Sequence, residues 1–131
     1  MERESINPEG LASPLGPYSY AVRVRDGELL FISGCVAVDA AGNTVGRGDV
    51  ALQVEQIMKI LESVLIHAGG TLRDVVKITS YMIDIAQFPK VAPVRARYLT
   101  QPYPASTTVQ VSKLIRDDFL IEVEAVAVLS G

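Results

Sequence analysis

The sequence contains very little cysteine and histidine. It contains one cysteine, Cys35, and one histidine, His67. A single cysteine forms no disulfide within one chain, and two such residues cannot supply the four ligands of a Cys/His zinc site. A catalytic serine triad would depend on His67 for its base. We therefore expect no internal disulfide, no metal and no serine-type nucleophile.

Positive charge and long apolar runs are also scarce. The net charge is −3, and the arginines are scattered rather than clustered. Such a chain repels a phosphate backbone, so nucleic-acid binding is not expected. No apolar run reaches the roughly 18 residues of a membrane span, and the first residues lack the pattern of a signal peptide. These absences favour a cytoplasmic protein with no membrane and no nucleic acid as partner.

What the sequence does contain is typical of one globular domain. Of its 131 residues, 49% are hydrophobic and 21% are charged, which allows a substantial core. We expect a single domain over residues 1–131. Pro, Gly and Ser are concentrated in residues 7–17, and an irregular lead-in is expected over residues 1–14.

The first half of the chain predicts two strands joined by a tight turn. Residues 20–24 alternate in type, and an apolar run begins at Glu28 and continues towards Val38. Asp26-Gly27 between them is typical of a two-residue hairpin turn. We therefore expect these strands to pair with each other.

A long amphipathic helix follows the hairpin. Apolar residues recur at steps of three and four from Val50 to Ala68, which indicates one face of a helix of about five turns. Asp49 suits the N-cap, because its carboxylate can accept hydrogen bonds from unpaired backbone amides. Gly69-Gly70 suits the end, since glycine adopts the left-handed conformation without steric cost.

The second half predicts a strand, a helix and two more strands. Residues 75–83 are rich in β-branched types. A helix is expected over residues 88–99 with Asp84 as its cap, and Pro93 requires either a kink or a start near that residue. The last two strands are predicted at residues 106–111 and 120–129, as neighbours that bring the hydroxyl cluster of residues 106–108 near a carboxylate of the second strand.

This order, β-β-α-β-α-β-β, predicts an α+β fold with both helices on one face of a mixed sheet. The opposite face would then be bare. The residues expected on it are apolar: Val109, Val111, Ile121 and Val123. Because a bare apolar face usually marks an association surface, we expect a closed homo-oligomer.

Short motifs spread along the chain are informative together. They are Gly16-Pro17-Tyr18-Ser19, Phe31-Ile32-Ser33-Gly34, Asp74-Val75-Val76-Lys77-Ile78-Thr79 and Ile121-Glu122-Val123-Glu124-Ala125. In this order and spacing they resemble the RidA (YjgF) family of reactive-intermediate deaminases, from about Leu15 to Val128. The resemblance implies a chorismate-mutase-like fold and a homotrimer with a cleft between neighbouring subunits.

The resemblance also implies a chemistry, because members of that family hydrolyse small enamines and imines to ketones and ammonia without a metal or bound cofactor. It makes Glu122 the catalytic residue, which helps to place the attacking water. Ser106 stands directly after Pro104-Ala105, where the family has an arginine that grips the substrate carboxylate. The positions implied to bind substrate are Tyr18, Ser33, Gly34, Ser106 and Thr108.

The serine at position 106 changes what the cleft is expected to bind. A guanidinium holds a carboxylate through two charge-assisted hydrogen bonds, whereas a serine offers one neutral donor. Affinity for a carboxylate should fall by about one to two orders of magnitude or more. The substrate then either lacks a carboxylate or is held differently, with Lys113 or Arg116 as candidate replacements.

Three kinds of function remain open at this point. The favoured one is an enamine or imine deaminase, a hydrolase acting on C–N bonds. The alternatives are a non-catalytic small-molecule-binding trimer and a partner that regulates another enzyme. Glu122 could equally be a salt-bridged strand residue, and Cys35 a small apolar filler.

Overall fold

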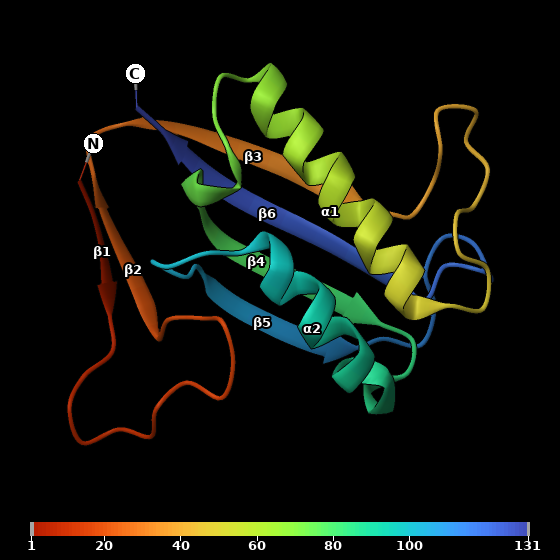
Figure 1. The fold of residues 1–131 in the computed structure, drawn as a ribbon, viewed down its shortest axis with the longest axis horizontal. Coiled ribbons are helices and arrows are strands. Elements are labelled where there is room, and N and C mark those ends of the chain that lie inside the picture. Colours follow the sequence, from red (N-terminus) through yellow and green to blue (C-terminus); the bar gives the residue numbers. More distant parts are fainter. Residues whose placement is uncertain (1, 131) are drawn as a thin grey trace.

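The structure, a computed structural model, describes residues 2–130. Strands β3, β6, β4 and β5 form a four-stranded sheet in that order, with β5 parallel to β4 and β6 antiparallel to both of its neighbours. Helices α1 and α2 lie side by side over one face of it (Figure 1). The predicted α+β fold is thereby confirmed. The elements are β1 (Glu2–Ile6), β2 (Ala21–Arg25), β3 (Glu28–Cys35), α1 (Val50–His67), η1 (Leu72–Asp74), β4 (Val75–Met82), η2 (Ile85–Gln87), α2 (Phe88–Tyr98), β5 (Ala105–Gln110) and β6 (Ile121–Leu129).

Helix α1 is built as its sequence pattern predicts. The side chain of Asp49 accepts a hydrogen bond from the Leu52 amide at 3.1 Å, so it is the N-cap. Ile57 and Leu61 of the predicted stripe are fully buried against the sheet, whereas Val64 near its end is 38% exposed. Gly69 follows the helix with a φ of 91°, a conformation that glycine adopts easily.

Helix α2 begins earlier than one of its predicted alternatives. It starts at Phe88 and continues through Pro93, so a start near Pro93 is wrong. Asp84 does not cap this helix. Its carboxylate accepts from the Ala86 amide at 3.0 Å and caps the short 3-10 helix η2 instead.

The N-terminal segment differs most from prediction. The expected irregular lead-in contains strand β1, and β2 pairs antiparallel with β1 rather than with β3. The predicted hairpin between β2 and β3 is therefore wrong, although Asp26 and Gly27 do have positive φ values of 56° and 119°. Residues 2–25, here called the arm, lie beside the β5 edge of the sheet (Figure 1).

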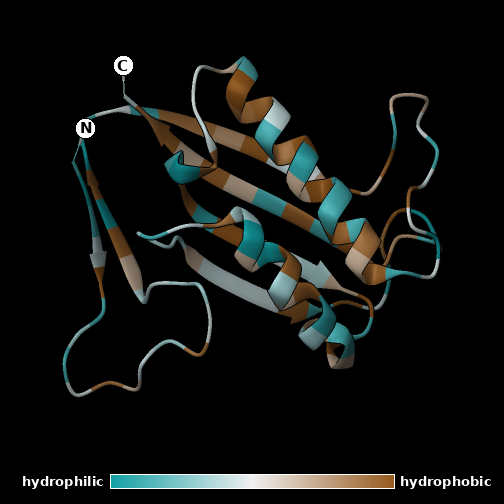
Figure 2. Cartoon of the chain, in the orientation of Figure 1, coloured by the Kyte–Doolittle hydropathy of each residue, from teal (hydrophilic) through white to brown (hydrophobic). Residues whose placement is uncertain are grey.

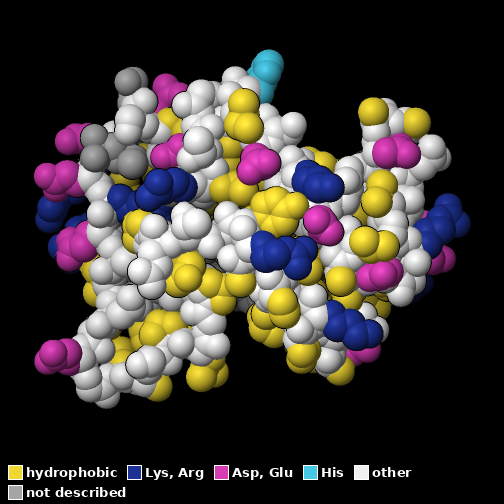
Figure 3. All heavy atoms as spheres, in the orientation of Figure 1, with side chains coloured by type: hydrophobic (Ala, Val, Ile, Leu, Met, Phe, Trp, Pro, Cys, Tyr) yellow, Lys and Arg dark blue, Asp and Glu magenta, His cyan; other side chains and the backbone are white. Residues whose placement is uncertain are grey.

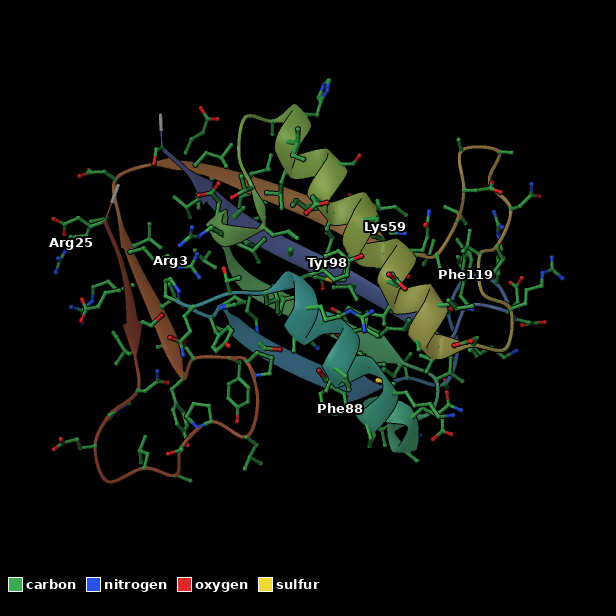
Figure 4. All side chains as sticks on the ribbon, viewed as in Figure 1. Arg3, Arg25, Lys59, Phe88, Tyr98 and Phe119 are labelled. Carbon is green, nitrogen blue, oxygen red and sulfur yellow. The ribbon has the colours of Figure 1, made fainter. Side chains whose placement is uncertain are left out.

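Four hydrogen bonds hold the arm to the rest of the molecule. Arg3 reaches from β1 (Figure 4) and donates to the carbonyls of Arg73 and Pro102. Ser19 donates from its amide to the Pro104 carbonyl at 3.0 Å and from its hydroxyl to the Tyr103 carbonyl at 2.6 Å. These bonds place the loop between β1 and β2 next to β5, and that loop forms part of the site.

The two faces of the sheet carry different residues from those expected. Ile121 and Val123 are 0% exposed beneath the helices, so their predicted place on the bare face is wrong. Their neighbours Glu122 and Glu124 alternate with them on the opposite side, here called the open face. Only the first five residues of β6, Ile121–Ala125, alternate between apolar and charged, and this alternation does not say whether the helices of the same chain or another copy cover the apolar set. Figure 2 shows the apolar stripes of the helices and the more polar colours of β5.

Candidate functional site

A cavity of about 190 Å³ opens between the arm, α2 and β5. Figure 3 shows the molecule hollowed at this place, with apolar side chains around the opening. Its volume equals roughly that of six water molecules in the liquid, which suits a ligand of a few heavy atoms. The lining residues are Leu15, Gly16, Pro17, Tyr18, Phe88, Ala92, Arg95, Ser106 and Thr108.

Three of the predicted substrate-binding residues meet in this cavity. Ser106 and Thr108 are two residues apart on β5, so their side chains share the face that α2 covers. Tyr18 comes from the arm, and its hydroxyl lies 3.3 Å from the Leu15 amide, which donates to it. Hydroxyl groups from two distant segments are thus brought together around one small volume.

The most unusual residue of the cavity is Arg95 of α2, which was not singled out from the sequence. Its side chain is 4% exposed. It donates to the hydroxyl oxygens of Ser106 at 3.0 Å, Ser80 at 3.3 Å and Thr108 at 3.5 Å. These hydroxyls hold the guanidinium across β4 and β5, directly beside the position where an arginine was expected.

The charge of Arg95 has no counter-ion in the described part of the chain. None of the ion pairs within residues 2–130 involves it, and its Nε atom is buried without a hydrogen-bond partner. Burial lowers the pKa of Arg95 to about 10, so the group is still protonated at neutral pH. A fixed positive charge therefore stands at the wall of the cavity.

A sequence signal for Arg95 did exist. It falls on the same helical stripe as Val91, Val94 and Tyr98, at steps of three and four. Val91 and Val94 are buried. Arg95 therefore lies on the side of the helix that faces the core, where a charged residue is unexpected. Such a charge is rare unless it is paired or functional.

The other predicted site residues lie on the open face. Glu122 of β6 extends against the β-bulge of β3, where Gly34 is located. A methyl group at Gly34 would collide with the Glu122 carboxylate, so a glycine is required for this contact. Ser33 lies in a neighbouring hollow with Lys77, Thr79 and Glu124.

Charges on the open face interact with one another. Tyr81 donates its hydroxyl to Glu124, which makes Glu124 a structural acceptor. The hydrogen bond to Glu124, then burial, raise the pKa of Tyr81. Burial and, secondly, the nearby Glu122 raise the pKa of the Cys35 thiol, so Cys35 is a poor nucleophile at neutral pH.

The predicted site is thus divided within one chain. Glu122 pairs across the sheet with Tyr81, and Ser106 with Ile78. The strands β6 and β5 are separated by β4, so the expectation that they are neighbours is wrong. Because Glu122 and Ser106 also point to opposite faces, one copy does not bring them together.

The two candidate replacements for the missing arginine do not reach the cavity. Lys113 and Arg116 line a different depression, beyond the end of β5, with Phe119. Arg116 donates to the Gly42 carbonyl at 2.8 Å and stacks over the Phe119 ring at 5.0 Å. Within residues 2–130, Arg95 is the cationic residue that lines the cavity.

Residues 2–130 contain no group of three or more His, Cys, Asp or Glu side chains placed to hold a metal ion. None of the helices in this range has both the length and the apolar character needed to cross a membrane.

Comparison with known proteins points to one family. The model of the family described as Endoribonuclease L-PSP matches residues 10–129. A RutC family protein of Pyrococcus abyssi is 36% identical, with 97% of this chain and 98% of the relative covered. The 3-aminoacrylate deaminase RutC of Acinetobacter baylyi is 35% identical, again with 97% and 98% covered.

A solved structure agrees with the whole fold. The crystal structure of YyfB from Yersinia pestis, described as a member of the conserved Rid protein family, superposes with a TM-score of 0.91. It is 34% identical, and the match covers 98% of this chain and 100% of that one. Taken with the fold and the extent of the sequence matches, this shows that the chain belongs to the Rid (YjgF, Endoribonuclease L-PSP) family.

Proposed function

We propose that the protein is a deaminase-type hydrolase that converts a small enamine or imine to a ketone and ammonia. The observation that carries the proposal is the small cavity, which is lined by the hydroxyl residues Tyr18, Ser106 and Thr108 and by a buried cation, Arg95, that donates to Ser106 and Thr108. Membership of the family, and the relative named as a 3-aminoacrylate deaminase, support the same reaction class.

The reaction needs a group that activates water. Water adds to the carbon of the C=N bond, a proton passes to nitrogen, and the resulting carbinolamine loses ammonia to leave C=O. Glu122 is the candidate for this proton transfer, because a positioned carboxylate can act as a general base and then as a general acid. Gly34 keeps the space that this carboxylate occupies.

The division of the site requires an assembly. Because Glu122 lies on the open face and the cavity on the helix side, the complete site forms between copies of the chain. The assembly proposed is a homotrimer, in which Glu122, Ser33 and Gly34 of one copy face the cavity of the next. Large exposed side chains on the open face, Phe31 at 74% among them, support burial there.

The test is ammonia release from a panel of imines and enamines, 2-iminopropionate included, by the wild type and Glu122→Ala. Removing a general acid–base is expected to slow turnover by about 10²- to 10⁴-fold. Glu124→Ala is the matched control, since it removes the next carboxylate of the same strand face. Equal loss in both variants, or no turnover by an intact wild-type trimer, contradicts the proposal.

One observation favours a second candidate, a non-catalytic binding trimer. Among residues 2–130 of one chain, the cavity is lined by a cation and hydroxyls but by no carboxylate to activate water. Saturable binding of a small ligand without any ammonia release would favour this function over hydrolysis.

A further inference from the structure

The cavity contains a buried cation that a ligand can neutralise. We propose that Arg95 of α2 binds the carboxylate of the substrate, in place of the arginine that is absent at position 106. The inference rests on the proposed function for the reacting part of the substrate, whereas carboxylate binding can be measured by itself. The substrate class then becomes the 2-imino or 3-imino acids and their enamine tautomers.

The geometry supports an arginine on helix α2 in place of an arginine on strand β5. Arg95 reaches from the helix to a point 3.0 Å from the Ser106 hydroxyl, so its guanidinium lies beside the position where a strand arginine would begin. Serine at 106 is small and accepts a hydrogen bond from it. An arginine at 106 in addition to Arg95 would place two cations together.

The hydrogen-bonding capacity of Arg95 is not filled. A guanidinium has five N–H donors. Three are directed to the neutral hydroxyls of Ser80, Ser106 and Thr108, and Nε has no partner. Buried donors normally have acceptors. A carboxylate oxygen of the substrate would accept from the N–H groups of Arg95 that have no partner in the protein.

The surroundings make the charge effective. A buried charge without a counter-ion destabilises a fold, so a purely structural role is better met by neutral residues. The three hydroxyls fix the guanidinium before any ligand arrives, and such preorganisation favours binding. Pro17 and Phe88 in the lining provide apolar walls, where low polarity strengthens attraction between opposite charges.

The experiment compares two ligands of nearly equal shape by calorimetry. Pyruvate, the ketone product of 2-iminopropionate, carries a carboxylate, and pyruvamide carries a neutral amide. Wild type should bind pyruvate at least about tenfold more tightly. Arg95→Gln should weaken pyruvate binding by about 10- to 100-fold and change pyruvamide binding little. Lys59→Gln, which removes an exposed cation of helix α1 outside the cavity, should leave both unchanged.

A second variant guards against a folding defect. Arg95→Gln combined with Ser106→Arg moves the guanidinium from helix to strand and should recover the preference for pyruvate. A folded Arg95→Gln with wild-type pyruvate affinity overturns the inference, as does a wild type without preference. Absence of ammonia release with the preference intact contradicts the proposed function alone.

An independent observation concerns the outer edge of β3. Within residues 2–130, β3 pairs with β6 at one edge and has no partner strand at the other. Leu29 and Phe31 on this strand are 62% and 74% exposed. Unpaired edges of this kind readily accept another strand.

The arm has a strand that fits this edge. β2 pairs only with β1 among the described strands, and an isolated two-stranded hairpin is marginally stable. In the register of a two-residue Asp26-Gly27 turn, Val24 would lie opposite Leu29 and Val22 opposite Phe31, which matches apolar with apolar. The same register places Arg25 opposite Glu28.

The chain's own β2 is directed away from this edge, because the arm is bonded beside β5 at the other side of the sheet. The arm is almost a fifth of the chain, so a TM-score of 0.91 over 98% of it requires a similar arm position in the Yersinia pestis crystal structure. We infer that β2 of a second copy completes the edge of β3, by exchange of arms between subunits.

Cysteine cross-linking distinguishes exchange from a hairpin within one chain. Val24→Cys with Leu29→Cys, in a Cys35→Ser background, should oxidise to covalent dimers and trimers on a non-reducing gel. Co-refolded single variants, one with each cysteine, should give a covalent heterodimer. A cross-link only within single chains overturns the inference, as does no cross-link.

Discussion

The two faces of the central sheet hold their charged groups in opposite ways. On the helix side one cation, Arg95, is buried among neutral hydroxyls and an apolar wall. On the open face Glu122, Glu124 and Lys77 stand on neighbouring strands and reach partly into solvent. The covered face therefore stabilises the fold and holds one fixed charge. The open face contributes little core, and its groups can serve an interface or a reaction.

The largest expected difference between the faces is in stability. Ile78 and Thr79 are neighbours on β4 that point to the covered and open faces, with Ile78 1% exposed. Ile78→Ala should lower the free energy of unfolding by about 2–5 kcal/mol, and Thr79→Ala by less than about 1 kcal/mol. Urea titration of each variant measures both. A cost for Thr79→Ala as large as that for Ile78→Ala would contradict this difference between the two faces.

The second largest expected effect is a loss of turnover caused by a substitution on the open face. Gly34→Ala places a methyl group where the Glu122 carboxylate lies, and the flexible side chain is expected to move away. Because a displaced general base loses efficiency steeply, turnover should fall by roughly tenfold or more, with a small change in melting temperature. Steady-state kinetics with 2-iminopropionate provide the measurement. Unchanged turnover would remove Glu122 from the chemistry.

The smallest effect uses Cys35 as a reporter of the charge on Glu122. Burial, and then Glu122, raise the pKa of this thiol, so Glu122→Gln should speed its alkylation at pH 8 by about two- to fivefold. A raised pKa favours the neutral thiol in the folded state. The neutral thiol of Cys35 therefore stabilises the folded protein at pH values below the pKa that Cys35 has in the unfolded chain. This stabilisation is lost as the pH rises through the pKa of Cys35 in the folded protein. Identical alkylation rates in both proteins would mean that the carboxylate does not act on Cys35.

Much of the fold was predictable because its signals are local. The periodic stripe and the caps of α1 lie within 22 consecutive residues, from Asp49 to Gly70, and the structure confirms them. The family motifs were equally local, and they indicated the correct architecture. The structure brings Tyr18, Ser106 and Thr108 to one cavity, and their role in binding substrate stays a prediction.

The failures share a physical cause. Alternation shows that Ile121 and Val123 share one face of the strand, but not whether the helices of the same chain or another copy cover that face, so they were placed on the wrong side. The Asp26-Gly27 dipeptide does turn the chain, but it does not choose the partner of β2. Both outcomes depend on contacts between residues far apart in the chain.

By itself the sequence determined the α+β fold, the limits of its main helix and its family, and it singled out the hydroxyl residues that line the cavity. Only the tertiary structure decided that Arg95 from α2 occupies the space beside Ser106, and that Glu122 faces the other way. Periodicity and capping act over a few residues and are visible in the chain. A cavity instead forms where distant segments pack together, and its charge depends on the element that happens to reach it.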